Sequence, residues 1–424
     1  MKSVNLERFI PDFNRIYTFD VPSSKSILNR ALILAAFTEG DTQIKCGAYG
    51  EDTQAVIDCL SALGIPVEHC NGGLLVHGCG KNIPNKNAQL NVMSAGTCAR
   101  FLPAALAAIG GEYLFESSEQ MKKRPMGFLD ELKKAGVEIE YSEEAGRFPF
   151  RMRSKGFQTR EFTLDTDMST QYASALLMAG ALGREPVHIR LTGTRVQGSY
   201  IQMTLALLNA FKADCQKEND LFSVYPVKAS TPEFEAEADV SAACYFYALA
   251  LLFGIKVLVR RVKKNSLQGD MQFLRLLEAR GVRLQETDEG LLADGSGISS
   301  FVGFIEDFND FSDQTLTAAA LAPFASSPSR LTGIGHIRRQ ECDRIAAIQN
   351  NLTVLGVPCK TGEDFVAIEP ALPKGGSIIT YHDHRVAMAF ALTALKTGAL
   401  EIDDGECCKK TFAAYFEELK KIYQ

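Results

Sequence analysis

Basic residues recur where apolar helices are expected to begin. A helix N-terminus leaves backbone N–H groups free and carries the positive end of the helix dipole. Such an end, joined by Lys or Arg, is suited to binding an anion, and several ends meeting in one cleft would bind a multiply charged ligand. The basic side chains in or just beyond these helix starts are Lys25, Arg30, Arg100, His384 and Arg385.

A structural interpretation competes with this one at each position. Ser, Thr and Asp are preferred N-caps, so a hydroxyl at a helix start taken alone favours capping over binding. Surface Lys and Arg are usually solvated. Basic residues at the starts of apolar helices are less easily explained in that way, and they favour a binding role.

The helix starts themselves form a repeat. A short polar segment runs into an Ala/Leu-rich stretch of helical length about every 70 to 75 residues, a spacing that indicates a repeated supersecondary unit. Each stretch is apolar nearly all round, so we expect a helix buried inside a domain. Runs such as 186–191 and 256–260 are typical of strands between these helices. The six stretches begin at Val21, Met93, Met168, Val240, Phe311 and Tyr381.

Length and composition limit the function classes. A chain of 424 residues favours two domains, and a net charge of -6 argues against nucleic-acid or membrane partners. The apolar stretch 245–260 is too short to span a bilayer and is expected to be a buried helix followed by a strand. The 11 cysteines lack zinc-like spacing and are expected to be free thiols in a reducing cytosol. The charged start lacks the apolar run of a signal peptide.

An ordered set of motifs resembles the 5-enolpyruvylshikimate-3-phosphate synthases, from about Val21 to the end of the chain. Each motif alone is of moderate specificity, whereas the ordered set is highly specific. The segments are Ser24-Lys25-Ser26 with Asn29-Arg30, Ala95-Gly96-Thr97 with Arg100, Lys123-Arg124-Pro125-Met126, Ser169-Thr170-Gln171, Asp313, Glu341-Cys342-Asp343-Arg344, His382-Asp383-His384-Arg385 and Lys410-Thr411-Phe412.

The resemblance implies an α/β fold: a two-domain inside-out α/β barrel, the enolpyruvyl transferase fold. Each domain would hold three β-α-β-α-β-β repeats with helices inside. One domain is expected at 21–235, and the other would combine 1–20 with 236–424. In the family the domains close on the acceptor and the active site forms between them.

The resemblance also implies two sets of binding residues. Multiply charged ligands require several cations, with Arg suited to two-pronged contacts. The set for phosphoenolpyruvate would be Lys25, Gly96, Arg124, Gln171, Arg344, Arg385 and Lys410. The set for shikimate 3-phosphate would be Lys25, Ser26, Arg30, Ser169, Thr170, Gln171, Tyr200, Asp313, His336 and Gln340.

Three residues are implied to be catalytic. Asp313 is the candidate base for the acceptor hydroxyl, Glu341 would move the proton at the methylene carbon, and Lys25 would stabilise charge. We expect no cofactor and no metal, because Arg and Lys supply the electrostatic clamp. We also expect a cytoplasmic monomer whose partners are small anionic substrates.

Plainer interpretations exist for several of these residues. Asp313 could be only an N-cap for the helix that follows it. Glu341 and Arg344 could be only an i,i+3 pair on a helix. His382 and His384 have an H-x-H spacing that resembles a metal site, but no third ligand is evident nearby, so we expect them to position Arg385.

The chain departs from the family pattern on the acceptor side and in the loop before Gly96. Ser94 replaces an Asn, Thr170 and Gln197 each replace a Ser, His336 replaces an Asn, and Gln340 replaces a Lys. The phosphoenolpyruvate set is complete, so the donor is better supported than the acceptor. The family is the target of glyphosate, which Gly96 would admit, although Cys98, Ala99 and Phe101 alter the helix behind it.

Three other functions compete. An enolpyruvyl transferase acting on UDP-N-acetylglucosamine would usually carry a Cys in the loop before Arg124-Pro125, and residues 118–123 contain none. A non-catalytic anion-binding homologue would lose its acid/base groups, yet Asp313 and Glu341 are present. A fold analogy to RNA-end cyclases would require a nucleotide site, and no Gly-rich phosphate loop is apparent.

Overall fold

The computed structural model describes residues 2–228 and 231–424. The chain packs as two compact units: unit 1 comprises Met1–Pro22 with Glu237–Gln424, and unit 2 comprises Ser23–Ala236. The predicted boundaries, at 20/21 and 235/236, lie within two residues of these limits. That the units are separate domains stays a prediction.

Unit 2 contains three four-stranded sheets and seven helices among its described residues. Its helices are α1 (Lys25–Ala36), α2 (Glu51–Ala62), α3 (Gly96–Ile109), α4 (Glu119–Lys122), α5 (Leu129–Lys134), α6 (Thr170–Leu182) and α7 (Ser199–Ala210). Its strands are β3 (Glu39–Lys45), β4 (Val67–Cys70), β5 (Gly73–Cys79), β6 (Asn87–Asn91), β7 (Gly111–Glu116), β8 (Glu138–Tyr141), β9 (Phe150–Ser154), β10 (Glu161–Asp165), β11 (Val187–Thr192), β12 (Cys215–Glu218), β13 (Leu221–Val224) and β14 (Glu233–Glu235).

Unit 1 follows the same plan with more 3-10 turns, labelled η. Its helices are α8 (Val240–Phe253), α9 (Met271–Glu278), η1 (Asn309–Gln314), α10 (Thr315–Leu321), η2 (Ala322–Phe324), η3 (Gly335–Arg339), α11 (Arg344–Val354), α12 (His384–Thr397), η4 (Glu406–Lys410), α13 (Tyr415–Lys420) and η5 (Lys421–Tyr423). Its strands are β1 (Val4–Asn5), β2 (Ile16–Phe19), β15 (Lys256–Arg260), β16 (Arg283–Glu286), β17 (Gly290–Asp294), β18 (Ile305–Asp307), β19 (Ser329–Thr332), β20 (Cys359–Thr361), β21 (Phe365–Ile368), β22 (Gly376–Ile378) and β23 (Leu400–Ile402).

One sheet pattern recurs in both units. In the sheet β6-β7-β9-β8, the β6–β7 pair is parallel and the other two pairs are antiparallel. The parallel pair requires a crossover, which α3 supplies, whereas β8 and β9 are joined directly. Four further sheets repeat this order of strands, and the last sheet of unit 1 has three strands, β1-β23-β22. The predicted β-α-β-α-β-β repeat is confirmed, with this shortened last copy.

The first strand of one sheet in each unit comes from a distant part of the chain. β14 pairs in parallel with β3 and takes the place of the first strand of the motif, which comes before α1. In the chain, however, β14 comes about 200 residues after α1. β2 likewise pairs in parallel with β15. The chain therefore runs from β2 in unit 1 to α1 in unit 2, and returns from β14 to α8.

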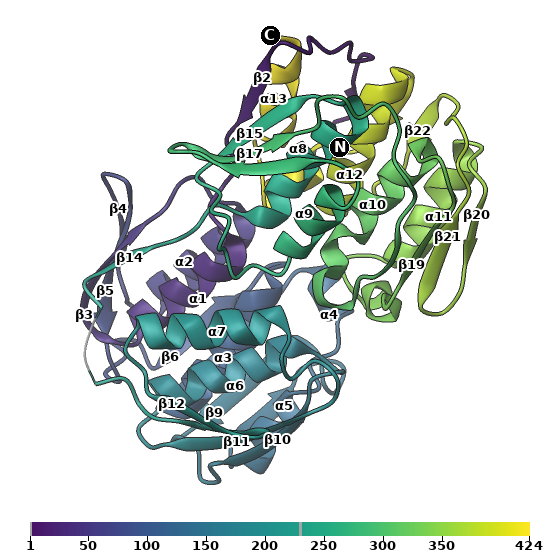
Figure 1. The fold of residues 1–424 in the computed structure, drawn as a ribbon. Coiled ribbons are helices and arrows are strands. Elements are labelled where there is room, and N and C mark those ends of the chain that lie inside the picture. Colours follow the sequence, from purple (N-terminus) through teal and green to yellow (C-terminus); the bar gives the residue numbers. More distant parts are fainter. Residues whose placement is uncertain (1, 229–230) are drawn as a thin grey trace. The chain divides into compact units, whose positions relative to one another are not determined.

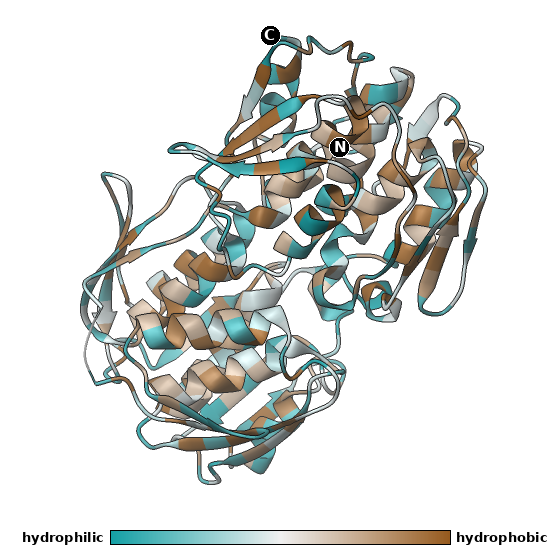
Figure 2. Ribbon diagram, viewed as in Figure 1, coloured by the Kyte–Doolittle hydropathy of each residue, from teal (hydrophilic) through white to brown (hydrophobic). Residues whose placement is uncertain are grey.

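The apolar helices lie inside each unit, with the strands around them (Figure 1). Every residue of α3 is buried, and so is all of α8 except Ser241. These helices are rich in Ala and Leu, so they have no polar stripe that would favour a surface position. Figure 2 shows the inner helices mostly in apolar colours. The six predicted inner helices are confirmed as α1, α3, α6, α8, α10 and α12.

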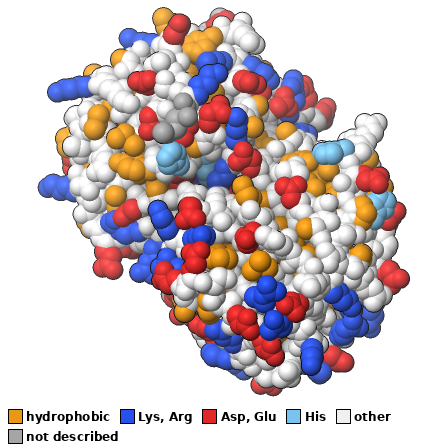
Figure 3. Space-filling view, turned by 180° about the vertical axis from the view of Figure 1, so that it is seen from behind, with side chains coloured by type: hydrophobic (Ala, Val, Ile, Leu, Met, Phe, Trp, Pro, Cys, Tyr) orange, Lys and Arg blue, Asp and Glu red, His pale blue; other side chains and the backbone are white. Residues whose placement is uncertain are grey.

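The cysteines match the expectation of free thiols. The 11 cysteines are free thiols. On the face drawn in Figure 3, Lys/Arg and Asp/Glu side chains are interspersed. Within residues 2–228 and 231–424, no helix is long and apolar enough to cross a bilayer.

Candidate active site

Arg344 is the centre of an ion-pair network in unit 1. Its side chain is 1% exposed and its guanidinium reaches three carboxylates. Nη1 donates to Asp313 Oδ1 at 2.9 Å, Nη2 to Glu341 Oε2 at 2.9 Å, and Nε to Asp383 Oδ2 at 2.7 Å. Burial alone would lower the pKa of Arg344, but these carboxylates raise it above its usual range. Arg344 is thus a fixed cation around which three anions are arranged.

Asp313 joins Arg344 to Arg385. Its Oδ2 pairs with Arg385 Nη2 at 2.7 Å, while Oδ1 faces Arg344. Asp313 lies in η1, and α10 begins two residues later with Gln314 at its N-cap position. The interpretation of Asp313 as a mere N-cap is therefore wrong, because its carboxylate is held by two guanidinium groups.

Glu341 lies between Arg344 and Lys410. Its second carboxylate oxygen is 3.9 Å from Lys410 Nζ, and both side chains are about nine-tenths buried. The i,i+3 pair with Arg344 exists, but Glu341 precedes α11, whose N-cap is Asp343. The helix-pair interpretation therefore describes only one contact of a larger cluster.

The loop before α12 aims Asp383 into this network. Asp383 is fully buried and caps α12 by accepting from the backbone N–H of Arg385 at 2.9 Å. Tyr381 and His382 both have a positive φ, of 54° and 56°. Non-glycine residues rarely adopt this conformation, and it is often retained where a site needs a special chain direction. From the sequence, Asp383 was recognised only as the residue between His382 and His384, and its contact with Arg344 was not predicted.

The two histidines of that loop have separate partners. His382 Nδ1 is 3.1 Å from Asp404 Oδ2, whereas buried His384 lies 3.7 Å from Asp383 Oδ1. Within the described ranges, no three His, Cys, Asp or Glu side chains form a group suited to a metal ion. His384 is the first residue of α12, directly before Arg385. That the two histidines position Arg385 stays a prediction.

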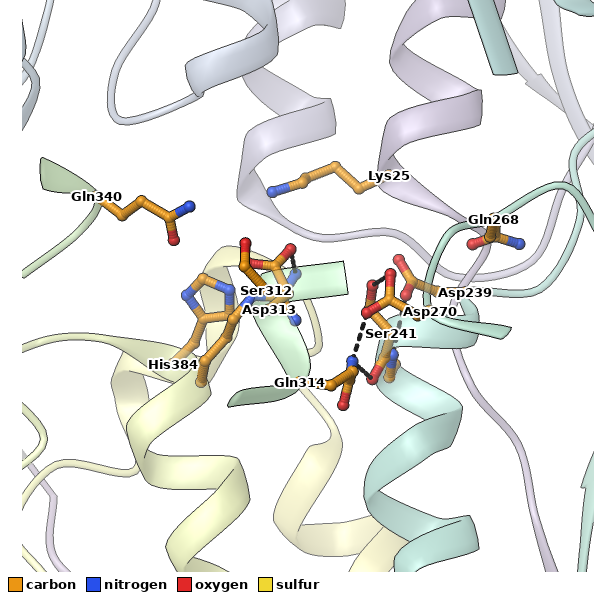
Figure 4. Close-up of polar contacts among 12 residues, drawn as sticks. Lys25, Asp239, Ser241, Gln268, Asp270, Ser312, Asp313, Gln314, Gln340 and His384 are labelled. Carbon is orange, nitrogen blue, oxygen red and sulfur yellow. Dashed lines mark hydrogen bonds and ion pairs between the residues drawn. The ribbon is translucent and has the colours of Figure 1, made fainter. Parts of the chain in front are cut away.

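Two predicted acceptor residues lie beside the same network. Gln340 Oε1 accepts from Arg344 Nη1, and His336 Nε2 is 2.8 Å from the hydroxyl of Ser312. Ser312 immediately precedes Asp313, so both contacts border the candidate base. Figure 4 shows Gln340, His384 and Asp313 extending toward the same region of unit 1.

A second buried carboxyl, Asp270, was not found from the sequence. It is 4% exposed, and it accepts hydrogen bonds from Ser241 Oγ at 2.8 Å and Gln314 Nε2 at 2.7 Å (Figure 4). Burial and the charge of Asp313 raise the pKa of Asp270 to about 6, although Arg385 acts in the opposite direction. Its only sequence signal was its position just before a helix.

Unit 2 brings together the starts of α1, α2 and α3. Lys25, the first residue of α1, forms an ion pair with buried Asp52 on α2, with Nζ and Oδ2 3.1 Å apart. Asn29 Nδ2 donates to Thr97 Oγ1 on α3 at 2.7 Å and to the carbonyl of Asp52 at 3.4 Å. These contacts hold Lys25 against α2 and join α1 to both α2 and α3.

Gly96 begins α3 directly beside two guanidinium groups. A Cβ added at Gly96 would lie 3.4 Å from Arg124 Nη1 and 3.5 Å from Arg100 Nη1. Arg100 also donates to the Gly96 carbonyl at 3.3 Å and contacts Met121 Sδ. Gly96, Arg124 and the N-terminus of α3 therefore form a cationic cluster that lacks a side chain at its centre.

Arg30 is enclosed by protein groups of unit 2. It is 1% exposed, with Nε donating to Thr204 Oγ1 at 2.8 Å, Nη1 to the Ser26 carbonyl at 2.7 Å and Nη2 to Ser174 Oγ at 3.2 Å. Burial lowers its pKa to about 10. These contacts join α1, α6 and α7, so its contribution to acceptor binding stays a prediction.

The remaining predicted residues lie at helix starts of unit 2. Ser169 is the N-cap of α6 and accepts from the backbone N–H of Gln171 at 3.2 Å, so the capping interpretation holds for this hydroxyl. Thr170 is the first residue of α6. Tyr200 is the second residue of α7, and its carbonyl accepts from Thr204 Oγ1 at 2.8 Å.

Comparison with known proteins identifies the family. The model of the family EPSP synthase (3-phosphoshikimate 1-carboxyvinyltransferase) matches residues 17–419. The chain belongs to the EPSP synthase family. It is 37% identical to the 3-phosphoshikimate 1-carboxyvinyltransferase of Nostoc punctiforme over 96% of this chain and 97% of that one. It is 34% identical to the enzyme of that name from Serratia proteamaculans, over 96% of each chain.

Solved structures share the fold of this EPSP synthase family member. EPSP synthase from Acinetobacter baumannii superimposes with a TM-score of 0.79 at 24% identity, covering 98% of this chain and 97% of that one. The enolpyruvyl transferase NikO from Streptomyces tendae gives a TM-score of 0.74 at 13% identity, over 99% and 96% of the two chains. These likenesses confirm the predicted enolpyruvyl transferase fold.

Proposed function

We propose that the protein transfers the enolpyruvyl group of phosphoenolpyruvate to the 5-hydroxyl of shikimate 3-phosphate and releases phosphate. The reaction belongs to the shikimate pathway of aromatic amino acid biosynthesis. Membership of the EPSP synthase family supports the reaction, and the cluster of Asp313, Glu341, Arg344, Arg385 and Lys410 supplies groups suited to it.

The cations of the two units would hold the anionic groups of the substrates. Arg344, Arg385 and Lys410 are within salt-bridge distance of carboxylates in unit 1. In unit 2, Lys25 is the first residue of α1, and the guanidinium of Arg124 lies beside Gly96 at the start of α3. Guanidinium groups suit phosphate and carboxylate because they offer two parallel donors. The proposal assigns these five residues to phosphoenolpyruvate, with Gln171 and the open backbone at Gly96 completing the set.

The acid and base roles follow from the two carboxylates. A proton is delivered to the methylene carbon of phosphoenolpyruvate, and the neighbouring carbon becomes electrophilic. The acceptor hydroxyl then bonds to that carbon and gives its proton to a base. Loss of phosphate and of one methyl proton restores the double bond in the product. We assign the base to Asp313 and the proton at the methylene carbon to Glu341, with Lys25 stabilising charge.

Residues of unit 2 and of unit 1 would bind the acceptor. The proposal assigns it to Lys25, Ser26, Arg30, Ser169, Thr170, Gln171 and Tyr200 in unit 2, and to Asp313, His336 and Gln340 in unit 1. Gln340 contacts Arg344, so the cation missing at this position is replaced by a neutral amide beside a fixed guanidinium.

Phosphate release with different acceptors tests the function. The purified protein is mixed with phosphoenolpyruvate and, in parallel, with shikimate 3-phosphate, shikimate or UDP-N-acetylglucosamine. We expect rapid release only with shikimate 3-phosphate. Release only with UDP-N-acetylglucosamine would keep the enolpyruvyl donor and reject the acceptor, and no release with any alcohol would support a non-catalytic anion-binding homologue.

We also propose that the protein works as a cytoplasmic monomer on small anionic substrates, without nucleic-acid or membrane partners. The interspersed charges of Figure 3 and the net charge of -6 support this. Size-exclusion chromatography with light scattering at the assay concentration tests the oligomeric state, and a mass near 46.4 kDa is expected.

A further inference from the structure

Asp270 belongs to a polar cluster that ends next to the candidate base. Gln314 directly follows Asp313, and it is fully buried. Its Nε2 donates both to Asp270 Oδ1 at 2.7 Å and to the Ser241 carbonyl at 3.3 Å. Its Oε1 accepts from Thr317 Oγ1 at 2.8 Å. Both ends of the Gln314 amide are therefore held by hydrogen bonds, which fix its orientation, and Asp270 supplies one of these bonds.

The other oxygen of Asp270 binds the start of α8. Ser241 Oγ donates to Asp270 Oδ2 at 2.8 Å, and Ser241 is the second residue of α8, two positions after the N-cap Asp239. Asp270 thus connects α8 to the last residue of η1. Because Asp313 precedes that residue, the connection restricts where its carboxylate can lie.

Asp270 is also close enough to act by its charge. The charged and titratable groups around it are Asp313 on η1, Arg385 on α12, and Asp239 and Cys244 on α8. The charges of Asp313 and Asp270 repel each other, and Arg385 opposes this repulsion for both. Two guanidinium groups hold Asp313 and make it a weak base, whereas a second anion nearby makes it a stronger one.

We propose that Asp270 is a positioning residue for the transfer reaction: it fixes Asp313 through Gln314, and its negative charge strengthens Asp313 as a base. This inference rests on the proposed function. The repulsion is mutual, so each ionised carboxylate makes the other more basic. Asp270 is in neither of the two proposed substrate-binding sets, so the proposed role involves no contact with a substrate.

The protonation state of Asp270 changes within the pH range in which the enzyme can be assayed. Burial and Asp313 raise its pKa to about 6, while Arg385, Gln314 and Ser241 lower it. Above this pH Asp270 is ionised and strengthens Asp313; below it the effect is lost. The wild-type kcat should therefore show a partial step near pH 6, in addition to any steeper loss at lower pH.

Asp270→Asn separates charge from geometry. An Asn can still accept from Gln314 with its oxygen, and the Ser241 hydroxyl can turn to accept from its amide. We expect kcat at pH 8 to fall about three- to tenfold, KM for both substrates to stay within about twofold, and the step near pH 6 to disappear. A variant whose profile keeps the wild-type shape would overturn the inference.

Ser241→Ala is a second, independent test, because it should shift the pH of the step in kcat rather than remove the step. It removes a donor that stabilises the ionised carboxyl, so the step should move to higher pH. An unmoved step would also count against the inference, even if Asp270→Asn fails to fold. Wild-type protein inactive with phosphoenolpyruvate and shikimate 3-phosphate would instead reject the proposed function, so the two failures are distinguishable.

Discussion

Asp313 and Arg385 form a 2.7 Å ion pair in unit 1, although their side chains are 72 positions apart in the chain and come from different repeats. The start of α12 supplies the guanidinium and η1 supplies the carboxylate. Arg344 holds the other oxygen of the same carboxylate at 2.9 Å. The candidate base is therefore fixed by two cations before any substrate binds.

Replacing Asp313 tests its role as the base. Asp313→Asn keeps the size of the side chain and one oxygen for the guanidinium groups but removes the proton acceptor. We expect kcat to fall about 10³-fold, because general-base catalysis typically contributes 10²- to 10⁴-fold, with substrate Kd changed only severalfold. Steady-state phosphate release and calorimetric binding measure the two quantities.

Asp310→Asn is the matched control, because Asp310 is an exposed carboxylate of the same turn. It should retain the wild-type kcat. Equal losses in both variants would show that disturbance of η1, rather than loss of a base, explains the effect.

Removing Arg344 should destabilise the fold. Arg344→Ala would leave Asp313, Glu341 and Asp383 without their shared cation in a buried place. Breaking a buried ion pair from one side costs about 3–5 kcal/mol, so we expect a decrease of that order in the free energy of unfolding. Urea unfolding followed by circular dichroism measures it.

Arg283→Ala provides the comparison, since Arg283 is 69% exposed and pairs with Asp294 at 2.9 Å. An exposed pair contributes about 1 kcal/mol or less. If the two variants lose similar stability, the Arg344 network is not the buried anchor described above.

Gly96→Ala tests the open backbone at the start of α3. The added methyl group would lie 3.4 Å from Arg124 Nη1, which is ordinary contact, so we expect little loss of stability. It would occupy space assigned to phosphoenolpyruvate, and we expect KM for this substrate to rise about tenfold, as for a loss of about 1.4 kcal/mol in binding. KM for shikimate 3-phosphate should change less.

Gly127→Ala is the control, because a Cβ there would approach only Met168 Cε, at 3.6 Å. Its kinetics should match the wild type. A rise in both KM values for Gly96→Ala would indicate a general distortion of α3.

Asp270 also predicts a pH dependence of stability. Its pKa is raised from 3.8 to about 6 in the folded protein, so the folded state holds the proton more tightly. The resulting stabilisation is complete below about pH 4 and is lost as the pH rises through 6, a change of about 3 kcal/mol. Relative to Asp270→Asn, the wild type should therefore gain stability when the pH is lowered from 8 to 5.

Urea unfolding of both proteins at several pH values measures this difference. A constant difference between pH 5 and pH 8 would contradict the raised pKa. Asp130→Asn, which changes a carboxylate whose side chain is 69% exposed, should show no such dependence.

The sequence predicted the inner helices because their apolar composition and spacing are local properties. It also predicted that Asp313, Arg344 and Arg385 belong to one site, through the resemblance. It could not predict Asp270 or Asp383 as buried partners, since a lone Asp before a helix is equally consistent with a cap. Their roles depend on contacts 39 to 44 residues away, which are set by how the repeats pack.

The enclosure of Arg30 is a related case. A basic residue inside an apolar helix indicated a ligand contact, but the structure gives each guanidinium nitrogen a partner from unit 2. The hydroxyls of Ser174 and Thr204 were unremarkable in the sequence. Periodicity predicts which helices are buried, and it does not predict which polar groups they bury together.

Phosphorus NMR of a single mixture follows both substrates of the proposed transfer at the same time. The protein is added to equal amounts of phosphoenolpyruvate and shikimate 3-phosphate, and the phosphorus signals are followed with time. We expect the phosphoenolpyruvate signal to be replaced by that of inorganic phosphate, while the shikimate ester signal moves to that of its enolpyruvyl product. Unchanged signals of both substrates, with folded protein present, would contradict the proposed transfer.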